Sequence, residues 1–93
     1  MNEGKTRVKE AERILKALAN KRRLAIVSYL RKKPRSIVGD IAEDIQLSFK
    51  ATSKHLTILL AAEIVEREQE SLNMYYHLVE PMRPITKVTL ANL

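Results

Sequence analysis

Residues 37–60 restrict the fold of this chain more than any other stretch, because they hold two short apolar stripes with almost no linker between them. The first stripe recurs at helical spacing and consists of Ile37, Ile41, Ala42 and Ile45. The second consists of Thr52, Leu56, Leu59 and Leu60. Residues 46–48 interrupt the period, and the Ser48 hydroxyl can cap the second helix by accepting a bond from a first-turn N–H. We therefore predict helices over residues 37–45 and 49–62, joined by a tight turn.

The outer face of the helix predicted over residues 49–62 is small, polar and cationic. It carries Lys50, Ala51, Ser53, Lys54 and Thr57. No carboxylate occurs between Ser48 and Ala62. A helix-turn-helix that enters a DNA major groove needs such a face, because small residues allow close approach to base edges and lysine binds phosphate or guanine. The alternative is an ordinary helix hairpin whose polar face is only solvated.

Positive charge is concentrated in the first third of the chain. The net charge is +6 and the pI is about 9.8, but residues 1–35 alone carry +9 and the remainder carries −3. A basic segment of this kind can hold a phosphate backbone with salt-sensitive affinity. The alternatives are that the charge serves solubility alone, or that it contacts acidic lipid or RNA.

The composition excludes several classes of protein. The chain has 93 residues, which suffices for one domain over residues 1–93, and two glycines, which favours helices. It has no cysteine, so disulfides and thiol chemistry are excluded. It contains no membrane-length apolar run and no signal-peptide core, so we expect a cytoplasmic protein. Without a phosphate-binding glycine loop, a paired nucleophile and base, or clustered carboxylates, we expect no enzymatic activity.

Three further helices are predicted outside residues 37–62. The apolar positions of a first helix, over residues 5–18, are Val8, Ala11, Leu15 and Leu18, with Ile14 beside them. Asn20 can cap a second helix over residues 21–33, which Pro34 ends. Ser36 is the expected cap of the third helix. A last helix over residues 84–93 is too apolar for a free tail, so it packs either on the first helix of its own chain or on the same segment of another subunit.

Two extended runs around a polar turn predict a β-hairpin. Residues 64–70 become polar along the run, and residues 74–79 are rich in types that favour strands. The turn is expected at Ser71, Leu72 and Asn73, with Asn73 able to take a positive φ. So small a hairpin must lie against the helices as a wing. The predicted fold is mainly α with a small β-hairpin: a winged helix-turn-helix of about five helices and a two-stranded wing.

Three groups of residues in this order resemble the ArsR-type regulators of bacteria and archaea. Residues 15–26, LKALANKRRLAI, look like the family's opening signature, in which arginine-leucine follows an alanine-leucine-alanine run. The helix-turn-helix resemblance lies in Ile41-Ala42-Glu43, Leu47-Ser48, Ser53-Lys54-His55-Leu56 and Leu59. Residues 75–78, YYHL, look like the family's second wing strand. The matches span about residues 12–79.

The resemblance implies a homodimeric transcription regulator, usually a repressor, that binds double-stranded DNA. The terminal helices, about residues 5–18 and 84–93, would form the dimer interface, and the helix over 49–62 would read a palindromic operator. The expected DNA-binding residues are Ser48, Lys50, Ala51, Ser53, Lys54, His55, Thr57, Arg67, Gln69 and Asn73. Thr52 occupies a position that is usually aliphatic in the family, so we expect it to point inward. For His55 a packed structural role is the alternative to a phosphate contact.

Two departures from the family pattern bear on function. Metal-sensing members carry cysteines near the third helix or His, Asp and Glu on the last, whereas this chain has no cysteine and no such residue after Glu80. We therefore expect no metal effector and no cofactor. The wing is acidic around Arg67, so either its tip stays off DNA or neutral side chains make the contacts. This acidity leaves open a winged-helix module that binds a protein or RNA partner instead of duplex DNA.

Overall fold

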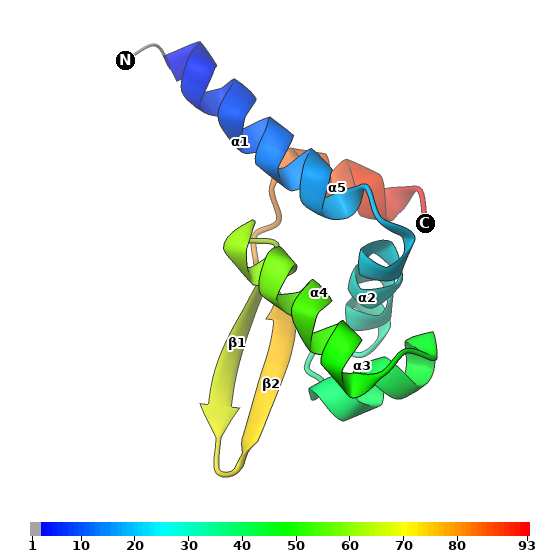
Figure 1. The fold of residues 1–93 in the computed structure, drawn as a ribbon. Helices are drawn as coiled ribbons and strands as arrows, with labels where there is room; N and C mark the ends of the chain where they lie inside the picture. The colour runs from blue at the N-terminus through cyan, green and yellow to red at the C-terminus, as the bar shows by residue number, and fades with distance from the viewer. Residues whose placement is uncertain (1–2) are drawn as a thin grey trace.

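The computed structural model describes residues 3–93 and has the predicted winged-helix architecture (Figure 1). Its elements in chain order are α1 (Glu3–Leu18), α2 (Lys21–Lys32), α3 (Val38–Ile45), α4 (Phe49–Ala61), β1 (Val65–Glu70), β2 (Asn73–Leu78) and α5 (Pro84–Ala91). The prediction of five helices and a two-stranded antiparallel wing is confirmed. Helix boundaries differ from the predicted ones by two residues at most. Within the described residues, no helix is both long enough and apolar enough to cross a membrane.

Helix α2 lies at the centre of the core. Its side chains Ile26, Val27 and Leu30 are buried, and the helix contacts α1, α3, α4 and β2. The other elements contribute fully buried side chains to the same cluster, among them Ile14, Ile41, Leu56, Leu59, Val65 and Leu90. Each such side chain contributes about 1.5–3 kcal/mol relative to an exposed one. Packing around α2 therefore fixes the positions of α3, α4 and the hairpin.

The predicted helix caps are confirmed at two positions and wrong at a third. The Asn20 side chain accepts from the backbone N–H groups of Arg22 at 2.9 Å and Arg23 at 3.1 Å. Ser48 Oγ accepts from the Ala51 N–H at 3.1 Å. Ser36 does not cap α3, whose cap position is Ile37, without a side-chain bond. The backbone of Ser36 instead pairs with that of Tyr76 in an isolated bridge, at 2.7 and 3.0 Å, and this non-local pairing draws Ser36 out of the cap position.

Two tight turns shape the part of the fold that carries the site. Between α3 and α4, Gln46 takes the left-handed conformation with φ 56° and ψ 51° and ends α3. In the hairpin, Glu70 pairs with Asn73, so Ser71 and Leu72 form a two-residue turn. The positive φ falls on Ser71, at 58°, and not on Asn73 as predicted. Asn73 is already paired as the first residue of β2, and its backbone is therefore extended.

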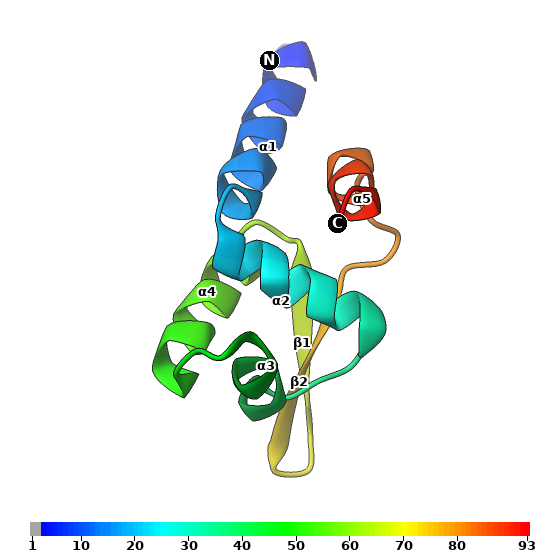
Figure 2. The ribbon, with the colours of Figure 1, turned by 90° about the vertical axis from the view of Figure 1, so that its right-hand side faces the viewer.

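The terminal helices pack together and leave apolar residues exposed. Helix α1 projects from the body at its N-terminal end, whereas the hairpin projects from the opposite end (Figures 1 and 2). Helix α5 contacts α1, and Arg83 forms an ion pair with Glu10. Of the apolar residues predicted for this helix, Ile14 and Leu18 are buried, whereas Val8 and Leu15 are 69% and 51% exposed. The apolar residues of α1 thus lie on two faces, only one of which faces the core.

Candidate nucleic-acid interface

Helix α4 separates its buried and exposed residues as the sequence predicts. Thr52, Leu56 and Leu59 are fully buried, so Thr52 points inward. Lys50, Lys54 and Thr57 are exposed, and Ala51 and Ser53 are half-buried at the edge of that face. Two lysines one turn apart therefore project from one surface without a carboxylate on the same helix. A surface of this kind attracts a polyanion.

Two hydroxyl groups of α4 and its cap, those of Ser48 and Thr57, already make local bonds. Ser48 is exposed, but its hydroxyl is engaged as the cap of α4. The Thr57 hydroxyl donates to the Ser53 carbonyl at 3.0 Å. Each hydroxyl oxygen keeps further hydrogen-bonding capacity, since a hydroxyl can donate once and accept twice. The cationic groups of Lys50 and Lys54 are left as the charged contacts that this face can offer.

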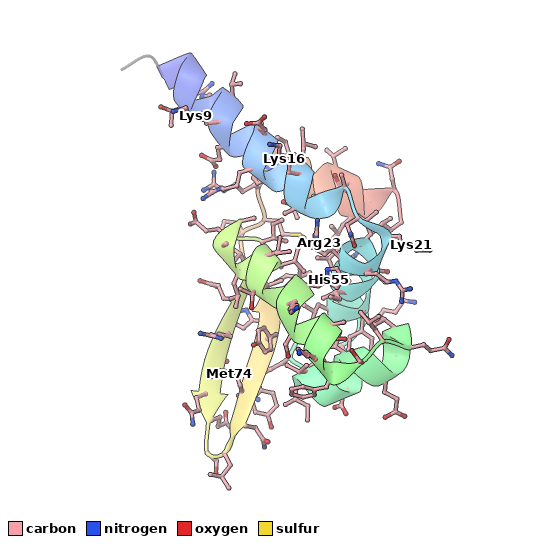
Figure 3. All side chains as sticks on the ribbon, viewed as in Figure 1. Lys9, Lys16, Lys21, Arg23, His55 and Met74 are labelled. Carbon is pink, nitrogen blue, oxygen red and sulfur yellow. The ribbon has the colours of Figure 1, made fainter. Side chains whose placement is uncertain are left out.

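His55 lies between the exposed face of α4 and helix α2, where it faces Arg23 (Figure 3). Arg23 Nη1 is 3.3 Å from His55 Nδ1. A guanidinium can only donate, so Nδ1 accepts and the imidazole proton resides on Nε2. Partial burial, followed by the charges of Arg23 and Arg22, lowers the pKa of His55 below its usual 6.5. His55 is therefore a neutral, partly packed side chain at neutral pH.

Arg23 also contacts the end of α1, a role that the sequence analysis did not identify. Its Nε donates to the Ala17 carbonyl at 2.5 Å and its Nη2 to the Lys16 carbonyl at 3.4 Å. The last carbonyls of a helix lack partners within the helix, and a guanidinium satisfies them well. In the sequence Arg23 is one of three consecutive basic residues, and nothing local distinguishes it from Lys21 or Arg22.

The wing places its cationic and acidic residues on opposite faces. Alternate residues of a strand point to the same face, so Arg67 and Gln69 share a face with Val65, whose side chain is buried. The other face carries the three carboxylates of β1, Glu66, Glu68 and Glu70. The carboxylates that neighbour Arg67 in the sequence therefore lie on the opposite face of the hairpin from its side chain. Asn73 pairs with Glu70 and lies on the acidic face.

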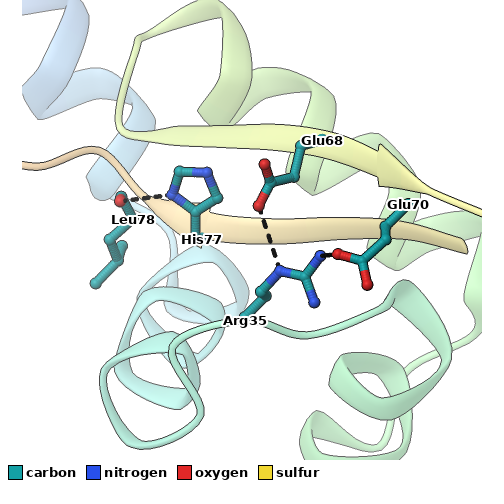
Figure 4. A network of polar contacts seen from close by, with 5 residues as sticks. All are labelled: Arg35, Glu68, Glu70, His77 and Leu78. Carbon is teal, nitrogen blue, oxygen red and sulfur yellow. Dashed lines mark hydrogen bonds and ion pairs between the residues drawn. The ribbon is translucent and has the colours of Figure 1, made fainter.

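Arg35 neutralises part of this acidic face (Figure 4). Its Nε is 3.3 Å from Glu68 Oε1 and its Nη2 is 2.5 Å from Glu70 Oε2. Its guanidinium lies 3.8 Å from the centroid of the Tyr75 ring. Burial lowers the pKa of Arg35, but the hydrogen bonds and charges of Glu68 and Glu70 outweigh it and raise that pKa overall. These contacts hold the wing against the loop before α3. They also neutralise part of the negative charge that the sequence of β1 indicates.

The ten residues predicted to bind DNA come from two parts of the fold. Seven belong to α4 or its cap, and three belong to the hairpin. Gln69 bends back to the turn, where its Nε2 donates to the Ser71 carbonyl at 3.3 Å. Arg67 is exposed and lies on the same face of the hairpin as Gln69, whereas Asn73 lies on the opposite face. Arg67 is thus the charged group that the wing can add to the surface of α4.

Metal-ligating side chains are dispersed in the described part of the chain. No group of three or more His, Asp or Glu residues there is placed to hold a metal ion. His55 lies on α4 and His77 on β2, where His77 Nδ1 is 3.1 Å from the Leu78 carbonyl oxygen.

Comparison with known proteins places this arrangement in a family. The family model described as bacterial regulatory protein, arsR family, matches residues 20–67, about half of the chain, from the cap of α2 into β1. The chain belongs to the ArsR family. The resemblance inferred from the sequence is thereby confirmed, and the protein is a transcriptional regulator of the ArsR type.

Individual ArsR-family relatives and winged-helix structures agree with this assignment. The arsenical resistance operon repressor of Bacillus subtilis (strain 168) is 33% identical over 79 residues, which are 84% of this chain and 75% of that protein. Reduced HlyU from Vibrio cholerae superposes with a TM-score of 0.80 at 29% identity, covering 100% of this chain and 94% of HlyU. The homodimeric winged helix-turn-helix DNA-binding domain of Mb0332 from Mycobacterium bovis gives a TM-score of 0.82 at 26% identity, covering 99% and 82%. The Bacillus relative is a repressor, and the Mycobacterium domain binds DNA.

Proposed function

We propose that this ArsR-family chain is a homodimeric repressor that binds a palindromic operator by placing α4 in the major groove. The observation that carries the proposal is the division of α4, in which Thr52, Leu56 and Leu59 are buried while Lys50 and Lys54 are exposed. The N-terminal residues of a recognition helix contact base edges and the adjoining phosphates. The proposed contacts are Ser48, Lys50, Ala51, Ser53, Lys54, His55 and Thr57.

The terminal helices support the dimer. Val8 and Leu15 on α1 are exposed, as is Val88 of α5, at 64%, and Leu93 just beyond it, at 56%. A second copy of the chain would bury such residues in a symmetric interface, where each copy presents the same surface. The two α4 helices of the dimer would then face one duplex, and the symmetry of the dimer would match a palindromic site.

The wing supports duplex DNA over a protein or RNA partner. The acidic face of β1 is the feature that favours the alternative, but Arg35 pairs with two of its carboxylates. Arg67 and Gln69 lie on the other face of the strand. Arg67 and Gln69 can therefore approach a phosphate from a face of β1 that carries no carboxylate of that strand. We include both among the proposed contacts, together with Asn73 from the opposite face.

Selection of bound duplexes from a random pool, followed by sizing of the complex, tests this function. The expected result is a palindrome bound by two chains. Failure to bind any duplex at low salt would refute the proposal and favour the winged-helix module with a protein or RNA partner. Binding of a single chain to a non-palindromic site would refute the symmetric dimer alone.

Lysine variants test the role of α4 within that complex. Lys50→Ala and Lys54→Ala should each weaken binding and reduce the slope of log affinity against log salt by about 1, because each removes a cation that neutralises a phosphate. Lys9→Ala is the matched control, because Lys9 is an exposed lysine on α1, far from α4 (Figure 3). If all three variants bind as the unchanged protein does, α4 is not the DNA-binding surface.

A further inference from the structure

Phe49 is an exposed aromatic residue at the start of α4 that neither the core nor the proposed dimer interface uses. Its side chain is 63% exposed, although Thr52 and Leu56 in the following turns are fully buried. The other strongly exposed apolar residues in this half of the molecule are Ile58, at 43%, and Leu72 at the tip of the wing, at 95%. Phe49 alone of these occupies the first turn of α4.

The surroundings of Phe49 favour a nucleic acid as the group that covers it. Ser48 fixes the beginning of the helix by accepting from the Ala51 N–H, so the position of Phe49 is set by the cap. Lys50 follows directly and is exposed, and Ser53, one turn on, lies on the same side of the helix. The two lysines of this face would not stabilise a complex with an apolar protein partner. They would attract the phosphate backbone of a nucleic acid.

We propose that Phe49 is a specificity-determining residue that packs against the C5-methyl group of a thymine in each half of the operator. This inference rests on the proposed function and adds the base that the first turn of α4 distinguishes. The thymine methyl is the apolar group of the major groove, and phenylalanine is among the side chains that contact it. The N-terminal residues of a recognition helix are those that reach base edges.

Replacement of single thymines by deoxyuridine in the selected operator tests the proposal, because uracil lacks only the methyl group. Burial of one methyl corresponds to a factor of about 4 in affinity. At one thymine position, uracil in one half-site should therefore weaken binding about fourfold, and uracil in both half-sites about fifteenfold. Phe49→Ala should bind the thymine operator more weakly and no longer distinguish uracil at that position.

Two further variants separate this contact from a general effect. Leu72→Ala also removes an exposed apolar side chain, but from the wing, and should keep the full cost of uracil. Phe49→Gln replaces the ring by a polar side chain, so uracil should no longer weaken its binding. Circular dichroism verifies that each variant is folded. The proposal is overturned if uracil costs nothing at every position, or if Phe49→Ala and Phe49→Gln keep the cost. If no duplex is selected at all, the proposed function is overturned as well. That outcome is distinct from the two above, in which the protein still binds an operator.

Discussion

Replacing Thr52 by valine should stabilise the protein. Thr52 is fully buried, and its Oγ1 is the buried side-chain oxygen or nitrogen that has no hydrogen-bond partner among the described residues. Burial of an unpaired hydroxyl costs about 1–3 kcal/mol. Valine places a methyl group at the same position and has a helix propensity close to that of threonine. We therefore expect Thr52→Val to raise the free energy of unfolding by about 1–2 kcal/mol.

Urea unfolding at a fixed protein concentration measures this change, since a dimer would make the transition concentration-dependent. For a chain of this length, each 1 kcal/mol should raise the Tm by about 4–8 °C. Thr57→Val is the matched control, because it makes the same exchange on the same helix at an exposed position. There the change should stay within about 0.5 kcal/mol.

A Thr52→Val variant that is no more stable than the unchanged protein would refute this reasoning. It would mean that the hydroxyl finds a partner in solution, such as the Ser48 carbonyl one turn earlier or a buried water molecule. Thr52→Ser distinguishes the contributions of the two groups, because it keeps the hydroxyl and removes only the methyl. We expect it to be less stable than the unchanged protein, because removing a methyl group from a packed core is destabilising.

Three other predictions concern pH, assembly and the wing. Since the pKa of His55 is lower in the fold than in the unfolded chain, the unfolded chain takes up the proton first as the pH falls. Stability should therefore decline below about pH 6.5, and His55→Gln should lose less between about pH 7.5 and 5.5 in urea titrations. Leu15→Glu should leave the fold intact but shift the protein to monomers in sedimentation velocity and weaken operator binding; a dimer as stable as before would exclude Leu15 from the interface. Arg35→Ala should change stability little, because its ion pairs are exposed, yet weaken DNA binding more at low salt than at high salt. An equal loss at both salt concentrations would show that the unpaired carboxylates do not act through charge.

The helices were predictable because their determinants are local. Apolar spacing located each helix, and Asn20 and Ser48 could be identified as caps from side-chain type and position alone. The hairpin followed from two extended runs and a polar turn. The prediction failed at Ser36 because a backbone bridge to Tyr76, forty residues away in the chain, decides its conformation. It failed at Asn73 because the strand register, and not the turn propensity of the residue, decides which residue takes the positive φ.

The candidate site was predictable to a similar extent and for the same reason. The buried and exposed faces of α4 follow from helical period, so Lys50 and Lys54 could be assigned to the outer face before the structure was known. The period of α1 could not show that Val8 and Leu15 lie off the core, because two apolar faces on one helix give a single broad stripe. Arg35 could not be found, since its partners are more than thirty residues away and the sequence contains many equivalent arginines.

Arg23 connects helices α1, α2 and α4. Its guanidinium donates to carbonyls at the end of α1 and approaches His55 on α4, while its own backbone N–H is held by the cap of α2. Helix α1 carries Val8 and Leu15, which we assign to the dimer interface, and α4 carries the lysines that we assign to DNA. A shift of α1 therefore cannot leave His55 in place without lengthening one of the contacts of Arg23. In the proposed dimer, the distance between the two α4 helices, which would have to match the spacing of the operator half-sites, should for this reason depend on Arg23.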